Sequence, residues 1–301
     1  MKSPASTPAV IGDEMDQTPL RIENPFVEFL RMYVRNIAAV GGFIVFLAIV
    51  LMAVIAPMVM NADPFEIVWS PSAPPGQDGF FLGTDNLGRS MLVEIIYGAR
   101  ASLAVGAAAA SITIVIGLLI GCLAGYYRGW VDEVLMRITE FFQVLPPLLL
   151  SMVLVALFSP TLNTVIFAIG IVSWPGVARL ARAEFLKIRE LEYVKAARSI
   201  GATDGRIIWR VILPNALPPL IVTAALTVGS AILFEAALSF LGLSDPNVMS
   251  WGKIIGDNRD YLLEAPWTVM FPGLAIFFTV LAVNLIGDGL NDAFNPKLRE
   301  R

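Results

Sequence analysis

The chain has 301 residues, of which 56% are hydrophobic and only 15% are charged, and its formal net charge is −4. Several apolar runs approach or exceed the length of about 20 residues that a helix needs to cross a bilayer. This composition argues against a soluble two-domain protein and predicts an all-α polytopic membrane protein. The small net charge and the lack of a basic tail argue against nucleic acid as a partner.

Histidine is absent and Cys122 is the single cysteine. The lack of histidine excludes histidine-ligated haem, most zinc sites and acid–base catalysis by imidazole. Cys122 lies inside an apolar run, where packing is favoured over the role of a reactive thiol. We therefore expect no metal, cofactor or catalytic site in this chain, and we expect it not to be an enzyme.

The first residues are polar, and residues 1–24 are expected to be disordered. Asn24-Pro25 predicts the start of a short helix that carries Phe29, Leu30 and Tyr33 on one side. Its spacing fits an amphipathic helix on the membrane surface, and the alternative is a polar approach to the first span. Both interpretations remain open at this point.

Six membrane spans are predicted from the apolar runs. Gly117, Gly121 and Gly125 recur at every fourth position of the second span and predict close approach of another helix. Residues 91–100 are expected to form a short helix that leads into this span, and Pro146-Pro147 predict a kink or a late start in the third. The predicted spans cover approximately residues 37–60, 101–126, 141–158, 162–177, 216–243 and 267–286.

Basic residues are distributed unevenly between the two predicted faces. Of the 21 Lys and Arg residues, 17 lie in segments that six spans would place on one face, and four lie on the other. The positive-inside rule then predicts that both termini are cytoplasmic and that residues 61–99 and 244–266 face outward. The basic segments are residues 1–36, 127–139, 179–210 and 289–301.

The segment 179–210 carries eight basic and four acidic residues between apolar runs. Its pattern predicts a short helix with one apolar face, which Gly201 would end in a left-handed conformation. Asp204 is expected to cap a second short helix, and Leu213-Pro214 to close the unit. Two short helices joined by glycine would form a stiff elbow that a partner could push. The predicted apolar face consists of Tyr193, Ala196, Ala197 and Ile200.

The order Lys195-Ala196-Ala197, then Gly201, then Leu213-Pro214, resembles the EAA loop of ABC importer permeases. Further fragments resemble the second permease of dipeptide and oligopeptide importers, so that the likeness extends over nearly the whole chain. Each fragment is weak alone, but together, in order and at the right separations, they are specific. These fragments span residues 81–89, 97–103, 235–243, 250–252, 271–274 and 284–296.

The resemblance implies a fold of the type I importer permease kind, with six transmembrane helices in the bacterial cytoplasmic (inner) membrane. It implies a heterodimer with a related permease subunit, two ATPase subunits that bind ATP and Mg²⁺, and an extracytoplasmic substrate-binding protein. The chain has no phosphate-loop motif of its own, so energy would arrive through the cytoplasmic loop. On this basis the organisation is a tail (1–36), a first transmembrane helix with an outer loop (37–100), and a permease core (101–301) that contains the coupling loop 179–214.

The resemblance also assigns the residues that would receive the motion of the ATPase. Lys195 stands where the family usually has Glu, which puts the usual salt bridge in doubt, and Glu192 one turn earlier could substitute for it. Val211 stands where Ile is usual. The expected coupling residues are Glu192, Tyr193, Lys195, Ala196, Ala197, Arg198, Gly201, Ala202, Leu213 and Pro214.

Glu235 is an ionisable residue inside the fifth predicted span, with Ser239 one turn further on. Such a residue faces protein or water rather than lipid, so it either lines the translocation path or makes a structural hydrogen bond. An ion-coupled secondary transporter is the alternative function, although one mid-span carboxylate is thin support for it. The related importers carry peptides, nickel chelates, glutathione, opines and other small solutes, and the sequence does not choose among these.

Overall fold

The computed structural model describes residues 25–294, and apart from two isolated β-bridges the regular structure of this part is helical. The predicted disordered tail 1–24 and residues 295–301 lie outside the described residues. The helices are α1 (Pro25–Arg35), α2 (Ile37–Met60), η1 (Gln77–Gly79), α3 (Met91–Tyr127), α4 (Gly129–Val144), α5 (Pro147–Phe158), α6 (Leu162–Arg189), α7 (Glu192–Ser199), α8 (Asp204–Arg206), η2 (Ile207–Ile212), α9 (Leu213–Phe240), α10 (Trp251–Asn258), η3 (Arg259–Tyr261) and α11 (Trp267–Phe294).

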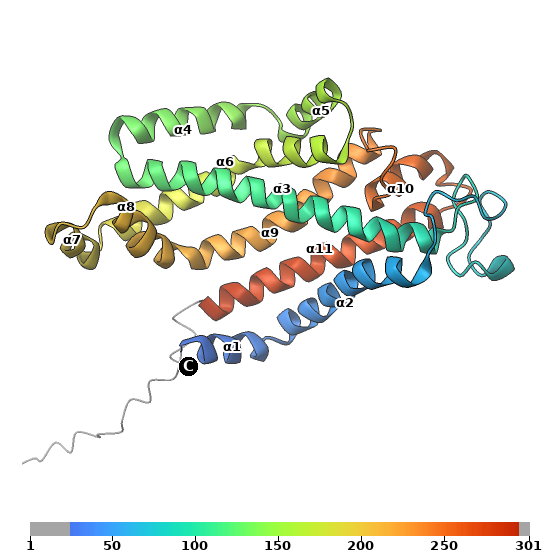
Figure 1. Cartoon of the computed structure of the whole chain (residues 1–301), viewed down its shortest axis with the longest axis horizontal. Helices are drawn as coiled ribbons and strands as arrows, with labels where there is room; N and C mark the ends of the chain where they lie inside the picture. The colour runs from blue at the N-terminus through green and yellow to red at the C-terminus, as the bar shows by residue number, and fades with distance from the viewer. Residues whose placement is uncertain (1–24, 295–301) are drawn as a thin grey trace, which may run out of the picture.

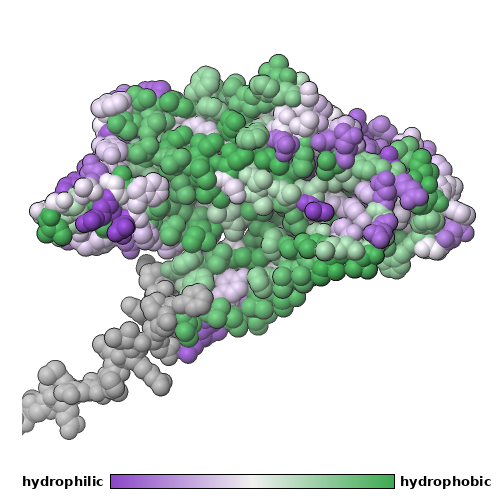
Figure 2. Space-filling view, viewed as in Figure 1, coloured by the Kyte–Doolittle hydropathy of each residue, from purple (hydrophilic) through white to green (hydrophobic). Residues whose placement is uncertain are grey.

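The long helices run lengthwise through the molecule, with α7, α8 and α1 towards one end and α10 and the loop 61–90 at the other (Figure 1). Apolar side chains cover the middle of the visible face, and hydrophilic ones gather at both ends (Figure 2). Among the described residues, five helices are long and apolar enough to cross a membrane. The all-α, multi-pass membrane fold is therefore confirmed.

The third predicted span is a broken one. Residues 141–158 are divided between α4 and α5, whose axes meet at 84° around Leu145-Pro146. Proline cannot donate the helical hydrogen bond and restricts the residue before it, so the helix restarts at Pro147. At 1.5 Å per residue α5 is about 18 Å long, well short of the hydrocarbon core of a bilayer. A sixth crossing therefore needs both arms of the bent pair.

Two predicted boundaries are wrong. The predicted short helix 91–100 and the second span form one continuous helix, α3, because no residue between them breaks the hydrogen-bond ladder. The fourth span does not end at Val177 but continues as α6 to Arg189, through Pro175. Proline bends but does not end a helix whose neighbours hold it, and the buried side chains of α6 provide that packing.

The glycines of α3 confirm the predicted close approach, and the partner is α6. A Cβ atom on Gly121 would lie 2.3 Å from the carbonyl oxygen of Ala178. A Cβ atom on Gly125 would lie 2.6 Å from Cβ of Phe185, which is fully buried. Side chains larger than hydrogen would force these two helices apart, so the glycines set their separation.

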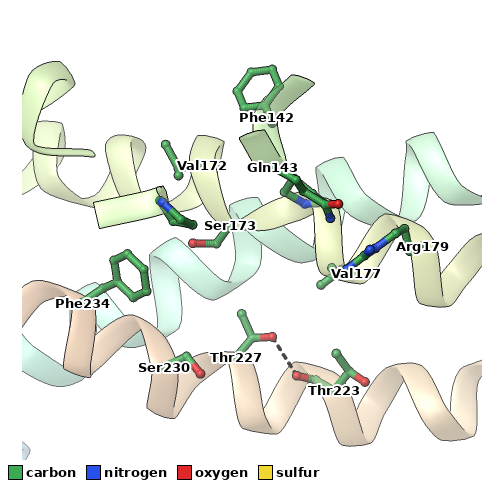
Figure 3. A pocket seen from close by; sticks show the side chains of 13 residues that line it. Phe142, Gln143, Val172, Ser173, Val177, Arg179, Thr223, Thr227, Ser230 and Phe234 are labelled. Atoms are coloured by element: carbon green, nitrogen blue, oxygen red, sulfur yellow. Dashed lines mark hydrogen bonds between the residues drawn. The ribbon is translucent and has the colours of Figure 1, made fainter. Parts of the chain in front are cut away.

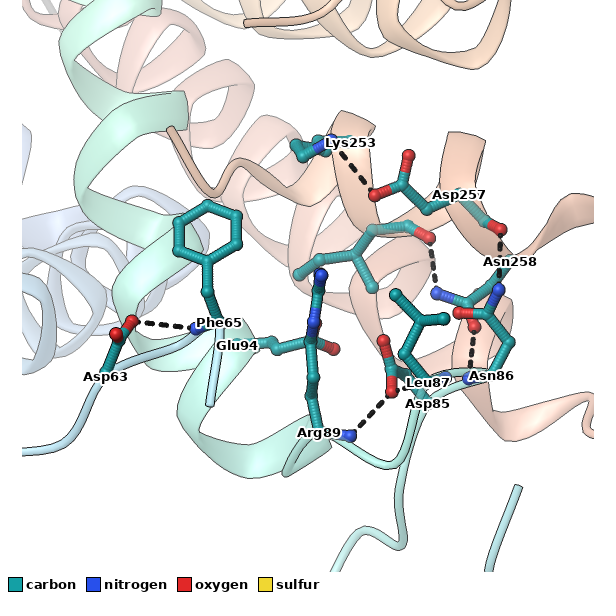
Figure 4. A network of polar contacts seen from close by, with 11 residues as sticks. Asp63, Phe65, Asp85, Asn86, Leu87, Arg89, Glu94, Lys253, Asp257 and Asn258 are labelled. Atoms are coloured by element: carbon teal, nitrogen blue, oxygen red, sulfur yellow. Dashed lines mark hydrogen bonds and ion pairs between the residues drawn. The ribbon is translucent and has the colours of Figure 1, made fainter. Parts of the chain in front are cut away.

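The loop 61–90 is held by buried polar contacts (Figure 4). Asp85, 1% exposed, accepts hydrogen bonds from the backbone N–H groups of Leu87 (2.9 Å) and Arg89 (2.6 Å). Burial raises the pKa of Asp85 above its ordinary value, while these donors and the Arg89 guanidinium act in the opposite direction. The Asn86 backbone N–H donates to the side chain of Asn258, 172 residues away. The loop is thereby fastened to α10.

Two tryptophans at this end of the bundle serve the same purpose. Trp251 is fully buried and its indole N–H donates to the carbonyl oxygen of Ile95 at 2.9 Å. The indole of Trp267 donates to the carbonyl oxygen of Thr84 at 3.1 Å. Both indoles thus hold the loop 61–90 and α10 against the bundle.

Candidate functional site: an exposed short helix and an intramembrane cavity

The first predicted helix of the polar loop is present as α7, Glu192–Ser199. Gly201 has φ +84°, as predicted for a residue that ends a helix in the left-handed region. The N–H groups of Gly201 and Ala202 donate to the carbonyl oxygens of Arg198 and Ala197, which satisfies the last turn. The prediction of a glycine-terminated helix is therefore confirmed.

The predicted apolar face of α7 points away from the rest of the chain. Tyr193 is 46% exposed, Ile200 is 85% exposed and Ala196 is also exposed, whereas Ala197, the fourth predicted member, is half-buried. The side chain that anchors α7 is Val194, which is 1% exposed and packs in a cluster with Phe185 and Ile207. An exposed apolar face on an anchored helix is the surface that a protein partner would cover.

The prediction of a second short helix in the elbow is wrong. The chain is helical without interruption from Asp204 to Phe240, so the loop after Gly201 leads directly into the fifth span. Asp204 lies in the first turn but does not cap it, because its carboxylate accepts a hydrogen bond of 2.5 Å from the Tyr126 hydroxyl. The residue at the N-cap position is Thr203, and its side chain makes no capping hydrogen bond.

The start of this long helix is unusual. Residues Ile207–Ile212 form a π-helix, and the N–H of Leu213 donates to the carbonyl oxygen of Ile208, five residues earlier. A wider turn here fits Pro214, which lacks an N–H and would crowd the carbonyl four residues before it. Leu213-Pro214 therefore does not close a unit but follows a widened turn inside one helix.

Lys195 forms an ion pair with Glu192, with 3.1 Å between Nζ and Oε1. Both side chains are largely exposed, at 53% and 90%, so the pair adds little stability. Glu192 was expected to substitute for the glutamate that the resemblance places at position 195. Its carboxylate is instead paired with Lys195, the residue that stands at that position.

Glu235 is buried at 3% exposure between α9 and the start of α10. Its Oε1 atom accepts hydrogen bonds from the hydroxyls of Ser239 (2.8 Å) and Ser250 (2.6 Å), and Gly252 packs against Oε2. The predicted proximity of Glu235 and Ser239 is thus present. The third member, Ser250, lies in a different predicted segment, and no local pattern connects it to Glu235.

A cavity of about 450 Å³ lies between α4, α5, α6 and α9 (Figure 3). Thr223, Thr227 and Ser230 line it from α9, at the spacing of one helix face. Each hydroxyl donates to the carbonyl four residues earlier, which leaves its lone pairs as acceptors. Arg179 is the one charged residue among those that line the cavity, and Glu235 and Ser239 are not among them.

Sequence reasoning missed this cavity. The signal was the recurrence of Thr223, Thr227 and Ser230 at intervals of four and three residues inside an apolar run. A polar stripe of this kind on a membrane helix faces protein or water.

Residues 117–300 match the family described as "Binding-protein-dependent transport system inner membrane component". Residues 24–75 match "N-terminal TM domain of oligopeptide transport permease C". These two matches leave only residues 76–116 of the described chain uncovered.

Full-length relatives agree with these matches. The chain is 40% identical to the Di/tripeptide transport system permease protein DppC of Pseudomonas aeruginosa, over 99% of this chain and 97% of the relative. It is 40% identical to the Dipeptide transport system permease protein DppC of Alkalihalophilus pseudofirmus, over 92% and 91%. It is 37% identical to the Glutathione transport system permease protein GsiD of Pectobacterium atrosepticum, over 99% and 98%.

The fold is similar to that of a permease in a solved transporter. A chain of the inward-facing MetNI methionine ABC transporter superposes with a TM-score of 0.58 at 22% identity, over 66% of this chain and 94% of that chain. The helical bundle, the matches along the chain and the exposed helix α7 at one end all indicate the same family. The chain belongs to the family of binding-protein-dependent transport system inner membrane components, and it is a transmembrane permease subunit of an ATP-driven importer.

Proposed function

We propose that this chain pairs with a related permease in the bacterial inner membrane and imports short peptides or similar small solutes. The substrate class rests on one observation. The chain is 40% identical to permeases named for dipeptides and for di- and tripeptides, over 91% and 97% of their lengths. Glutathione, the solute in the name of a third relative, is itself a short peptide. An extracytoplasmic binding protein would deliver the solute to the outer end.

The end that carries α7 lies in the cytoplasm in this proposal, together with both termini. The count of basic residues supports it, because the segments on that side hold 17 of the 21 Lys and Arg residues. The outer loop 61–90 and α10 then face the binding protein.

The α7 surface docks on an ATPase subunit in this proposal. Three features support it: the helix is anchored by Val194, it is ended by Gly201, and it leaves Tyr193 and Ile200 uncovered. Glu192, Lys195, Ala196, Ala197, Arg198 and Ala202 of the expected coupling residues lie on or directly after the same helix, whereas Leu213 and Pro214 begin α9. ATP and Mg²⁺ would bind to the ATPase subunits.

The cavity between α4, α5, α6 and α9 forms part of this chain's half of the translocation path in this proposal. Its volume of about 450 Å³ lies within the range of about 300–1,000 Å³ typical of small-molecule sites. Its hydroxyl oxygens offer acceptors to the N–H groups of a peptide, and Arg179 offers a cation to a carboxylate. Glu235 and Ser239 instead hold α9 to α10.

Uptake by cells that lack this chain tests the proposal. Returning the chain on a plasmid is expected to restore uptake of a radiolabelled dipeptide, and excess unlabelled dipeptide should compete. Uptake should persist when a protonophore collapses the membrane potential while ATP is maintained. Loss of uptake under that condition would favour the ion-coupled alternative, which neither the fold nor the relatives support.

A further inference from the structure

The last buried residue of α3, Tyr126, is a point at which four segments of the chain meet. The side chain is 3% exposed, and its ring lies within 5.7 Å of the Arg189 guanidinium and 5.6 Å of the Arg198 guanidinium. Arg189 ends α6 and Arg198 lies in the last turn of α7. Each arginine lies within the distance at which a cation is attracted to an aromatic ring.

The polar atoms of Tyr126 extend the same contacts. Its hydroxyl donates to Oδ1 of Asp204 at 2.5 Å and accepts from Nη2 of Arg198 at 3.4 Å. Its backbone carbonyl accepts a hydrogen bond from the guanidinium of Arg189. A hydroxyl bonded to a carboxylate is among the stronger hydrogen bonds in proteins. Tyr126 therefore contacts the segments on both sides of Gly201, which are α7 and the start of α8.

The helices that meet Tyr126 from the bundle side form a closely packed pair. Gly121 and Gly125 of α3 lie directly against Ala178 and Phe185 of α6, without room for a Cβ atom. Arg182 of α6 makes two hydrogen bonds, of 2.5 and 2.6 Å, to the carboxylate of Asp132 on α4. A displacement that reaches the end of α3 is therefore shared with α6 and α4.

The segment beyond Asp204 is easier to deform. It contains the π-helix Ile207–Ile212, and then Pro214, Pro218 and Pro219, each of which removes one helical hydrogen bond. If α7 were attached to the bundle only through its two chain connections, movement of α7 could be absorbed in this segment. The packing of Val194 with Phe185 connects α7 to α6, and the contacts of Tyr126 with Arg198 and Asp204 connect it to the end of α3, so neither connection passes through this segment.

We propose that Tyr126 is a positioning residue for energy coupling: it holds α7 and the start of α8 at a fixed place against α3 and α6. Displacement of the exposed face of α7 then moves the transmembrane helices rather than α7 alone. This inference rests on the proposed docking of α7 to an ATPase. It predicts that loss of the joint separates ATP hydrolysis from transport without loss of the complex.

The test uses the complete transporter, with partner permease, ATPase subunits and binding protein, in proteoliposomes. Tyr126→Phe removes the hydroxyl and leaves the ring between the two arginines, and Asp204→Asn weakens the same hydrogen bond from its other end. Uptake of labelled dipeptide and ATP hydrolysis are measured in the same vesicles. Both variants are expected to bind the ATPase and keep basal hydrolysis, while the uptake per ATP falls about fivefold, the effect of one hydrogen bond.

The matched control is Tyr127→Phe. Tyr127 is adjacent and 48% exposed, and its hydroxyl makes no hydrogen bond to any described residue. It should keep the uptake per ATP of the unaltered transporter. The double variant Tyr126→Phe with Asp204→Asn should fall no further than either single variant, because both remove one interaction.

Two results would overturn the inference. The first is an unchanged uptake per ATP in both single variants. The second is a parallel fall of uptake and hydrolysis together with a lower thermal unfolding temperature, which would make Tyr126 a structural anchor only. Failure of the proposed function is a different outcome, because the unaltered chain would then neither retain the ATPase subunits nor support uptake.

Discussion

The hydroxyl of Tyr126 donates a 2.5 Å hydrogen bond to the carboxylate of Asp204, joining two residues that are 78 positions apart in the chain. The bond connects the end of α3 to the first turn of α8. Side chains therefore fasten the polar loop to the membrane bundle at a defined point. The helix α7, which precedes Asp204 in this loop, has its apolar face directed away from the rest of the chain.

The exposed face of α7 gives the first prediction. Ile200→Asp places a charge where we propose that the ATPase binds, and should weaken its binding at least about tenfold, as loss of a central interface residue does. Ile200 is 85% exposed, so the unfolding temperature should not change. Co-purification of the ATPase measures the effect. Leu263→Asp, at a 96% exposed position between η3 and α11, is the control and should retain the ATPase.

The glycine contact between α3 and α6 gives the second prediction. Gly121→Leu adds a side chain whose Cβ atom would lie 2.3 Å from a backbone oxygen, so the helices must separate. The expected cost is about 1–3 kcal/mol or more, seen as a lower unfolding temperature of the detergent-solubilised protein. Gly273→Leu in α11 is the control, because nothing lies within 4 Å of its Cβ position. Equal unfolding temperatures for the two variants would contradict the close packing.

The buried carboxylate gives the third. Glu235→Gln keeps an oxygen that can accept from Ser239 and Ser250, whereas Glu235→Ala leaves both hydroxyl protons without this acceptor and opens a void. The alanine variant should be less stable than the glutamine variant by about 2–4 kcal/mol. If Glu235 instead lined the translocation path, the glutamine variant would behave differently. Glu235→Gln would then lower uptake at unchanged stability.

The cavity gives the fourth. Ser230→Trp should fill the space lined by Thr227 and Phe234 and block uptake of labelled dipeptide, while the complex still assembles. The control is Ser111→Trp on α3. Ser111 is also exposed and also donates to the carbonyl four residues earlier, but it does not line the cavity. Normal uptake with Trp at position 230 would show that the solute takes another route.

Hydropathy and glycine spacing predicted most of the bundle because both depend on residues that are close together in the sequence. A run of apolar residues identifies a membrane helix, and Gly117, Gly121 and Gly125 identify a face that another helix approaches. The left-handed Gly201 was predictable for the same reason, since a residue without Cβ adopts that conformation at little cost.

The features that escaped prediction depend on partners far along the chain. Asp204 has the residue type of a helix cap, but Tyr126 takes its carboxylate for a different contact. Ser250 completes the hydrogen bonds of Glu235 from another loop. The break at Pro146-Pro147 was expected, but the prolines alone do not give its angle, which is 84°.

The central claim, that α7 receives the motion of an ATPase, is tested most directly by cross-linking. A photoactivatable amino acid is placed at Ile200 in the assembled transporter, and a second transporter carries it at Leu263. Illumination should join position 200, but not position 263, to an ATPase subunit, and ATP should change the yield. A cross-link from position 263 to the ATPase, with none from position 200, would contradict the claim and reverse the proposed orientation in the membrane.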